Sequence, residues 1–211
     1  MIHYSSDYIF DGDIEKIIGS EPAGCAHSCE TCSLHRNRPI GYYENSDSNP
    51  INNYGKTKLA GEKEIVKNTK NFYLIRLSKL FGKPAANKNA KRSFFDIMLE
   101  AGKKNKEVRV VDEETSCFTF APDLAGKTKE IIDSGKPFGI YHITNSGACT
   151  WYGACVELYK LAKMKTKVIP VSGAEFPRPA KRPFYSVLIN TKLNPMKNWK
   201  EALKEYLKNL K

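Results

Sequence analysis

Residues 52–77, NNYGKTKLAGEKEIVKNTKNFYLIRL, contain a helix pattern followed directly by a strand pattern. In the first part, Leu59, Ile65 and Val66 can share one buried side while Glu and Lys cover the rest, which predicts an amphipathic helix. Residues 72–82, FYLIRLSKLFG, are mostly apolar and predict a strand with a polar exit. A helix that leads into a strand in this way is typical of an α/β protein with a parallel sheet.

The same alternation runs through the rest of the chain. We expect further strands or short extended segments at residues 1–6, 107–111, 139–144, 167–171 and 185–189. We expect further helices at residues 92–104, 121–135, 150–164 and 198–210, with two helical turns near residues 13–20. The alternation is less regular in the last third, which indicates an appended lobe.

Composition narrows the class of protein. The chain has 211 residues, of which 41% are hydrophobic, so it is long enough to bury a core. No run approaches 18 apolar residues, and no basic stretch followed by an apolar one opens the chain, so we expect neither a membrane span nor a signal peptide. A cytoplasmic location follows as the expectation.

The formal net charge is +11, and most of the basic residues are Lys. A nucleic-acid-binding protein would show clustered Arg with interleaved aromatic residues. Here the Lys residues are distributed over predicted helix faces, which favours solvated surfaces, and we expect no nucleic-acid partner. The positive field would still attract small polyanions.

Tyr54 and Lys58 are four residues apart on the predicted helix, so both side chains lie on one face. An ammonium near a phenol favours the phenolate, so such a tyrosine can exchange a proton near neutral pH. The pair alone is weak evidence for a catalytic site, because many helices contain such a pair by chance. The strand end at residues 5–12, SSDYIFDG, adds a serine that can polarise a carbonyl. Together they form a set for carbonyl reduction with a hydride from a nicotinamide.

The sequence resembles the extended short-chain dehydrogenase/reductases, and within them the dTDP-4-dehydrorhamnose reductase family. The matching stretches follow the family's order and cover nearly the whole chain apart from residues 13–41. They are IHYSSDYIFDG, YYENSDSNPINNYGKTKLAGE, IRLSKLFG, APDLAG, GIYHITNSGACTWYGAC and RPAKRPFYSVLINTKL.

The resemblance implies a role for each matching position. Ser6 stands where the family has its catalytic Thr or Ser. Tyr54 matches the proton donor, and Lys58 matches its partner, which also holds the nicotinamide ribose. Tyr4 lies where the strand passes the cofactor. Asp7, with Ser6, is placed to meet the sugar.

The resemblance also implies the fold and the reaction. It implies a partial Rossmann-like parallel sheet, with residues 1–145 as the C-terminal part of the catalytic domain. Residues 146–211 would form a substrate lobe and closing helix, interleaved with the first domain. Arg182 belongs to the lobe over the nucleotide sugar, where a structural salt bridge is an equal alternative. The implied reaction is the NADPH- or NADH-dependent reduction of a 4-keto deoxysugar nucleotide in dTDP-rhamnose biosynthesis.

The chain departs from the family in its glycines. Family members contain a Gly-rich turn that cradles the cofactor pyrophosphate, and no G-x-G-x-x-G occurs in these 211 residues. Three accounts stay open: a fragment of a longer product, a split protein whose other half is a separate chain, and a decayed relative. The chain can therefore be inactive alone, or work with a missing nucleotide-binding half or as a homo-oligomer. The alternative function is a non-catalytic sugar-nucleotide-binding or regulatory subunit.

A second departure is the insert at about residues 13–41. Cys25, Cys29 and Cys32 follow a C-x3-C-x2-C spacing, and His35 comes three residues later. Three thiolates and an imidazole suit a structural tetrahedral zinc site. Three cysteines can also hold an iron–sulfur cluster, and free thiols on a loop are the plain alternative.

A third departure concerns Lys79 in IRLSKLFG. The family carries a Trp at this position, which would give the sugar a flat apolar surface. We expect Lys79 to offer a charge instead, so the substrate can differ from that of the rhamnose reductases.

Overall fold

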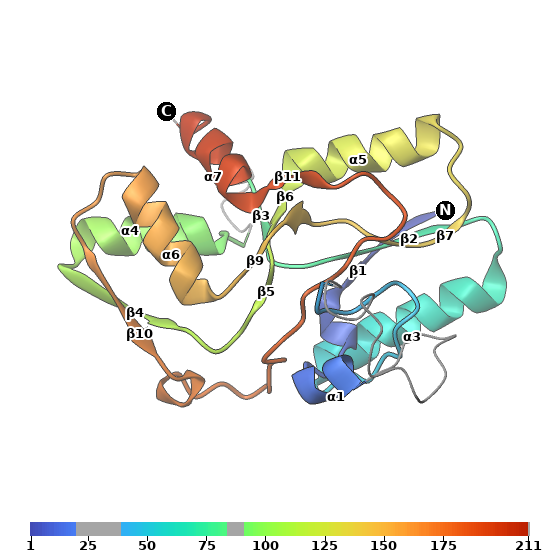
Figure 1. Ribbon diagram of the computed structural model, residues 1–211, viewed down its shortest axis with the longest axis horizontal. Coiled ribbons are helices and arrows are strands. Elements are labelled where there is room, and N and C mark those ends of the chain that lie inside the picture. Colours follow the sequence, from blue (N-terminus) through green and yellow to red (C-terminus); the bar gives the residue numbers. More distant parts are fainter. Residues whose placement is uncertain (20–38, 84–90, 211) are drawn as a thin grey trace, which may run out of the picture.

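The computed structural model describes residues 1–19, 39–83 and 91–210. Its centre is a parallel three-stranded sheet in the order β1-β2-β7 (Figure 1). The strands are β1 (Ile2–Ser6), β2 (Tyr73–Leu77) and β7 (Gly139–His142). The predicted α/β class with parallel pairing is therefore confirmed, and β1 is an end strand of this sheet.

Two helices sandwich the sheet, α3 (Asn53–Asn68) on one face and α5 (Ala121–Asp133) on the other (Figure 1). Helix α5 packs through Leu124 and Ile131 on an apolar layer from the strands. The buried members of that layer are Tyr73, Ile75, Tyr141 and Ile143. Because β1 lies at the end of the sheet, its residues Ile2 and Tyr4 are only partly covered and stay exposed.

A second lobe lies at the other end of the molecule (Figure 1). There β4 (Glu107–Val111) pairs in parallel with β10 (Lys167–Val171). Helices α4 (Phe94–Lys104), α6 (Trp151–Leu161) and α7 (Trp199–Lys208) pack around it. The shared core is rich in aromatic side chains: Phe81, Phe95, Phe118, Phe120, Tyr159, Trp199 and Tyr206. Elements from both sides of residue 145 build this core.

Short elements complete the described chain. They are η1 (Asp7–Ile9), α1 (Ile14–Gly19), β3 (Leu80–Phe81) paired with β6 (Thr119–Phe120), β5 (Ser116–Cys117) antiparallel to β9 (Ala148–Cys149), η2 (Gly173–Glu175), and β8 (Asn145–Ser146) paired with β11 (Met196–Asn198). The predicted extended segment 185–189 makes two isolated bridges, Tyr185 to Thr115 and Leu188 to Tyr42. These bridges hold residues 172–190, called the C-terminal segment below, against both lobes.

Helix α3 packs differently from its apolar pattern. Leu59 and Ile65 are half-buried as expected, but Val66 is 52% exposed, so the prediction for Val66 was wrong. The two fully buried positions of the helix are Gly55 and Glu62. Together with Leu59 they follow the i, i+4, i+7 spacing of one helix face. The pattern of apolar residues did not predict this face, because Gly55 and Glu62 are not apolar side chains.

The buried carboxylate of Glu62 pairs with Arg76 of β2. Arg76 Nε donates to Glu62 Oε1 at 3.1 Å and Nη2 donates to Oε2 at 2.7 Å, and both side chains are about 95% buried. The remaining Nη1 donates to the backbone oxygen of Glu44 at 3.2 Å. The guanidinium also lies 5.4 Å from the ring centre of Phe10. This bidentate pair fixes α3 against the sheet.

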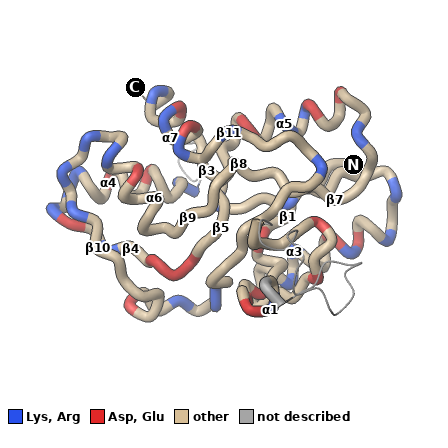
Figure 2. Tube along the Cα trace, viewed as in Figure 1, with Lys and Arg blue, Asp and Glu red and all other residues tan. Residues whose placement is uncertain are grey.

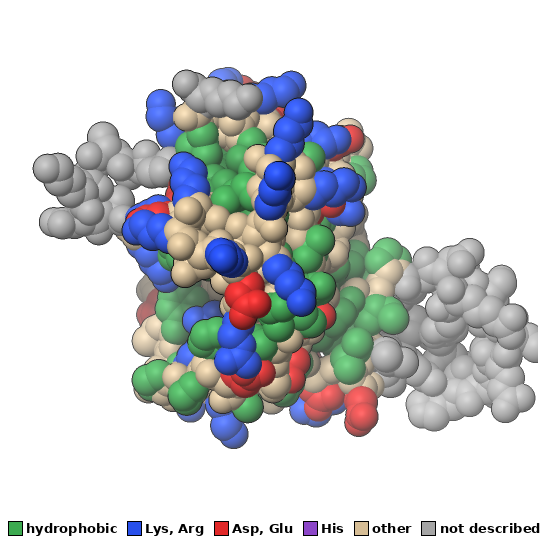
Figure 3. Space-filling model, turned by 90° about the vertical axis from the view of Figure 1, so that its left-hand side faces the viewer, with side chains coloured by type: hydrophobic (Ala, Val, Ile, Leu, Met, Phe, Trp, Pro, Cys, Tyr) green, Lys and Arg blue, Asp and Glu red, His purple; other side chains and the backbone are tan. Residues whose placement is uncertain are grey.

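Charged residues are spread along the helices and around the β4–β10 end of the chain trace (Figure 2). Figure 3 shows this end of the molecule, where Lys and Arg are separated by apolar and uncharged side chains. The distribution agrees with the predicted solvated Lys surfaces. In the part of the chain that the structure describes, no helix combines the length and apolar character needed to cross a bilayer.

Substituting Glu62→Gln should lower the free energy of unfolding by about 3 to 5 kcal/mol, because it leaves the buried Arg76 charge uncompensated. Urea unfolding followed by circular dichroism measures this change. The control Glu64→Gln lies on the exposed side of the same helix and should stay within about 0.5 kcal/mol of the unsubstituted chain. Equal effects of the two substitutions would contradict the role given to the buried pair.

Candidate functional site

The site begins where β1 ends. Ser6 has an extended backbone, with φ −139° and ψ 154°, and caps η1 by accepting the Tyr8 N–H at its Oγ at 3.2 Å. Its side chain is buried at the carboxyl end of the strand. The strand ends at this residue, and the cap holds the Ser6 hydroxyl at the start of η1.

The first turn of α3 is pressed against η1. Asn52 caps the helix by accepting the Gly55 N–H at 2.8 Å, and its Nδ2 donates to the Lys181 backbone oxygen at 2.9 Å. A Cβ at Gly55 would lie 2.0 Å from the Tyr8 backbone oxygen, so only glycine permits this approach. As a result the Tyr54 and Tyr8 rings meet edge to face, with centroids 5.8 Å apart.

Lys58 lies one turn further along α3 and reaches β1. Its Nζ donates to the Tyr4 backbone oxygen at 3.2 Å and lies 5.9 Å from the centre of the Tyr54 ring. The Tyr4 hydroxyl donates to Thr128 Oγ1 of α5 at 3.1 Å. The structure therefore gathers Tyr54, Lys58 and Tyr4 along the free edge of β1, where Tyr54 is 53% exposed.

Asp7 is buried directly after Ser6. Its Oδ1 accepts from Ser6 Oγ at 3.0 Å, and its Oδ2 accepts from Ser78 Oγ at 2.7 Å and Ser186 Oγ at 2.6 Å. Burial raises the pKa of Asp7, and the three hydroxyls oppose that rise. The side chain predicted to meet the sugar is thus 3% exposed and bonded to serines from three segments.

A cavity of about 950 Å³ opens next to the start of α3. It is lined by residues from 11–15, from 113–114 and from 172–184, together with Ile51. Ile51 directly precedes the Asn52 cap, and the Lys181 backbone bonded by that cap belongs to the opposite wall. The cavity therefore adjoins the turn that carries Tyr54.

The lining of this cavity includes five Asp or Glu and three Lys or Arg residues, and Glu114 lies beside both arginines. Its Oε1 accepts from Arg178 Nη1 at 2.8 Å, and its Oε2 lies 3.7 Å from Arg182 Nη1. The same Oε2 accepts the Trp151 indole N–H at 2.8 Å. The salt bridge considered for Arg182 is therefore present, while the arginine also lines the cavity.

Tyr8 connects the cavity to Tyr54. Burial raises the pKa of Tyr8 to about 12, and the positive charge of Arg182 opposes this rise. Tyr8 thus stays a neutral phenol that packs on Tyr54 near the arginines. Tyr8, Glu114 and Arg178 were not predicted from the sequence. Tyr8 and Arg178 stand in stretches that carry the family resemblance, which could have identified them, whereas nothing local to Glu114 signals a site.

Ser78 and Ser186 were also missed as contributors to the site. Each stands within a stretch that carries the family resemblance, IRLSKLFG and RPFYS, and that placement is the signal that could have identified them. Neither stretch reveals that both hydroxyls converge on one carboxylate.

Lys79 turns into the second lobe. It has a positive φ of 36°, and its Nζ donates to the backbone oxygens of Glu114 at 3.0 Å and Cys149 at 3.2 Å. The ammonium lies 4.1 Å from the Trp151 ring centre, and desolvation lowers the pKa of Lys79 to about 8. Two of its three N–H groups thus donate to backbone oxygens, and Lys79 does not line the larger cavity.

The predicted metal ligands Cys25, Cys29, Cys32 and His35 lie outside the described residues. Within residues 1–19, 39–83 and 91–210, no group of three or more His, Cys, Asp or Glu side chains is placed to hold a metal ion. The zinc site stays a prediction from the sequence.

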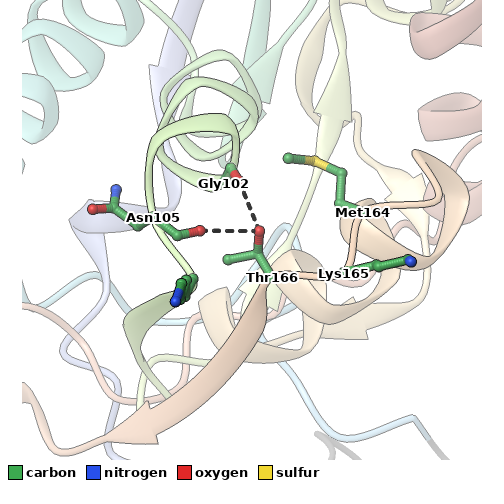
Figure 4. Close-up of a pocket in the computed structure, with 6 residues that line it drawn as sticks. Gly102, Asn105, Met164, Lys165 and Thr166 are labelled. Atoms are coloured by element: carbon green, nitrogen blue, oxygen red, sulfur yellow. Dashed lines mark hydrogen bonds between the residues drawn. The ribbon is translucent and has the colours of Figure 1, made fainter.

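A smaller cavity of about 430 Å³ lies at the end of α4 (Figure 4). Thr166 Oγ1 donates there to the backbone oxygen of Gly102 at 2.7 Å, and Met164 and Lys165 lie beside it. None of the residues predicted to act in catalysis or binding lines this cavity. Arg182 lines the larger cavity, and Ile51 of that cavity lies three residues before Tyr54.

Known proteins are similar to this chain over its whole length. The model of the RmlD substrate binding domain matches residues 1–211. The spore coat polysaccharide biosynthesis protein SpsK of Bacillus subtilis is 30% identical over 210 residues, which are 98% of this chain and 63% of that protein. A dTDP-4-dehydrorhamnose reductase of Streptomyces griseus is 31% identical, over 97% of this chain and 61% of that protein.

Solved structures show the same relation. A dTDP-4-dehydrorhamnose reductase from Clostridium acetobutylicum is 33% identical, with a TM-score of 0.80, over 99% of this chain and 65% of that one. The Bacillus anthracis enzyme in complex with NADP is 29% identical, also with a TM-score of 0.80. These neighbours confirm the Rossmann-like fold class. The chain spans less than two thirds of the length of these relatives.

Replacing Gly55 by Ala should lower the free energy of unfolding by about 1 to 3 kcal/mol, because the new Cβ collides with the Tyr8 backbone and displaces α3. Gly61→Ala is the matched control in the same helix, where a Cβ meets only the His3 ring at 3.8 Å. The control should raise stability by up to about 1 kcal/mol. Urea titration measures both, and a tolerated Gly55→Ala would contradict the close packing of α3 on η1.

Proposed function

Because the chain belongs to the dTDP-4-dehydrorhamnose reductase family, we propose that it carries the catalytic residues and sugar-nucleotide cavity of a nicotinamide-dependent reductase. The proposed substrate is a 4-keto deoxysugar nucleotide. The observation that carries this proposal is the arrangement of Tyr54 and Lys58 along the free edge of β1, beside the strand end that holds Ser6. It supports the proposal because Tyr54 packs on Tyr8, whose backbone N–H is bonded to the Ser6 hydroxyl, and Lys58 lies beside the same tyrosine.

Each residue has a distinct part in the proposed reduction. Ser6 binds the substrate carbonyl oxygen, and Tyr54 gives its hydroxyl proton to that oxygen as the alcohol forms. Lys58 stabilises the phenolate that Tyr54 becomes, until a proton from solvent restores the phenol. The nicotinamide, when bound, supplies the hydride that the carbonyl carbon accepts.

The residues at the β1 edge fit the nicotinamide end of the cofactor. The Lys58 ammonium and the Tyr54 phenol can reach ribose hydroxyls, and the exposed Tyr4 lies beside them. The pyrophosphate of the cofactor lacks its usual binding motif here, because the 211 residues contain no G-x-G-x-x-G turn. We propose that further polypeptide, covalently joined or separate, holds the pyrophosphate beside β1. Whether NADPH or NADH is used depends on that part.

The cavity suits the nucleotide end of the substrate. Arg178 and Arg182 line it and can pair with a diphosphate, to which arginine binds through two parallel N–H groups. Their current partner, Glu114, holds them at the cavity wall. The net charge of +11 would favour the approach of such an anion.

We expect any reductase activity of the chain with NADPH and dTDP-4-dehydrorhamnose to fall by a factor of about 100 to 10,000 on Tyr54→Phe, because no other group replaces the proton donor. Lys58→Met should have a similar effect. Lys56→Met, an exposed lysine on the same helix, is the control and should leave activity unchanged.

Fluorescence titration with NADPH accompanies the assay and separates two outcomes. Saturable binding without activity would refute the proposed reaction. Absence of binding at millimolar cofactor, with binding of the sugar nucleotide retained, would show that the cofactor site needs further polypeptide. Activity that survives Tyr54→Phe would refute the assignment of the proton donor.

A further inference from the structure

The hydrogen bonds of Ser6 leave its proposed role incomplete. A serine hydroxyl has one proton to donate and two lone pairs to accept with. Here the proton goes to Asp7 Oδ1 at 3.0 Å, and one lone pair accepts the Tyr8 N–H at 3.2 Å. In this arrangement Ser6 can accept one more hydrogen bond, but it has no proton for a substrate carbonyl. A donor role for Ser6 requires that its bond to Asp7 reverse.

The surroundings of Asp7 allow such a reversal. Among the described residues, its other oxygen is bonded to the hydroxyls of Ser78 and Ser186, at 2.7 and 2.6 Å. A hydroxyl can donate to a carboxylate or accept from a carboxylic acid, so this set satisfies both protonation states. A pair of backbone N–H groups in the same place would have tied the side chain to the ionised state.

The charged and titratable groups around Asp7 do not fix its ionisation. In the described part of the chain Lys79 is a cation that acts on Asp7, and its Nζ donates to the backbone oxygens of Glu114 and Cys149. Tyr8 of η1 and Cys117 of β5 also interact electrostatically with Asp7, and burial raises the pKa of both. Both therefore stay neutral near pH 7. Desolvation raises the pKa of Asp7 itself and favours its acid form.

We propose that Asp7 is a positioning residue that sets the direction of the Ser6 hydroxyl. As a carboxylate it draws the Ser6 proton inward. As a carboxylic acid it donates its own proton to Ser6 Oγ, and the Ser6 proton turns outward to the substrate carbonyl. The added proton comes from solvent and stays on Asp7, so none is passed to the substrate by this route.

The same contact couples the substrate cavity to the catalytic strand. Ser186 lies two residues after Phe184, the last residue of segment 172–184 that lines the cavity. Its backbone N–H donates to the Thr115 backbone oxygen at 2.9 Å, next to Glu114. A shift of this segment on substrate binding would therefore move a hydroxyl bonded to Asp7. This inference rests on the proposed function, because it assigns how Ser6 of that site becomes a donor.

The test begins with the chain alone. Its aspartates are labelled with ¹³C at the carboxyl carbon, and the Asp7 signal is identified by its loss in Asp7→Asn. From about pH 4 to about pH 9, the signal should titrate above the ordinary Asp value of about 3.9. The Tyr8 amide signal should shift with the same midpoint, because its N–H donates to Ser6 Oγ. Ser6→Ala should abolish that shift.

One serine variant and a matched control test whether the hydroxyls around Asp7 set its titration midpoint. Ser186→Ala removes a hydrogen bond that lowers the pKa of Asp7, so its midpoint should move to higher pH. Ser134→Ala, at the exposed end of α5, is the control and should leave the midpoint unchanged. An Asp7 signal that stays ionised throughout the range would overturn the proposal.

Binding of dTDP-4-dehydrorhamnose and of dTDP-rhamnose, the alcohol formed by its reduction, is measured by calorimetry as the second readout. A preference for the ketone of roughly three- to tenfold, the size expected of one hydrogen bond, should fall as pH rises through the Asp7 midpoint. Asp7→Asn should keep this preference at every pH, because its NH₂ can donate to Ser6 as the acid does. Loss of the preference in Asp7→Asn would overturn the proposal. If neither nucleotide binds the unsubstituted chain, the proposed function fails, and the titration still decides the coupling of Asp7 to Ser6.

Discussion

The buried pair of Arg76 and Glu62 is the interaction on which the placement of the site depends. Helix α3 has few fully buried side chains, so its apolar packing alone would hold it weakly against the sheet. The bidentate contact from β2 fixes its position and rotation. His142 lies 3.5 Å from Arg76, and burial lowers the pKa of this imidazole to about 3. The imidazole therefore stays neutral and adds no second positive charge beside the guanidinium.

With α3 fixed, its first two turns can carry the chemistry. Gly55 allows the helix to touch the backbone of η1, and this contact sets the distance between the Tyr54 ring and the end of β1. From this position of the helix, the Lys58 side chain can donate a hydrogen bond to the Tyr4 backbone oxygen. The exposure of Tyr54 and Tyr4 follows from the position of β1 at the end of the sheet, where a cofactor or more polypeptide can approach.

Two carboxylates join the site to the rest of the molecule. Asp7 ties β1 to the end of β2 and to the C-terminal segment through serine hydroxyls. Glu114 ties the same C-terminal segment to α6 through Arg178 and the Trp151 indole. Hydrogen bonds therefore link the end of β1 to the segment that lines the cavity, so a movement of one would displace the other.

The sequence by itself determined the α/β class, most of the helices and strands, and the identity of the Tyr54 and Lys58 pair. These features follow from residue types within a few positions of one another, whose periodicity fixes which side chains share a face. The family resemblance added Ser6 and Tyr4, because short stretches in a fixed order identify a fold without any knowledge of contacts.

Only the tertiary structure decided how the polar groups are partnered. Ser78 and Ser186 lie 71 and 179 residues from Asp7, and nothing near either serine indicates that they meet at one carboxylate. The burial of Glu62 and the exposure of Val66 likewise depend on Arg76 of the neighbouring strand. Hydrophobic periodicity is local, whereas the partner of a buried charge is set by chain segments that come together only on folding.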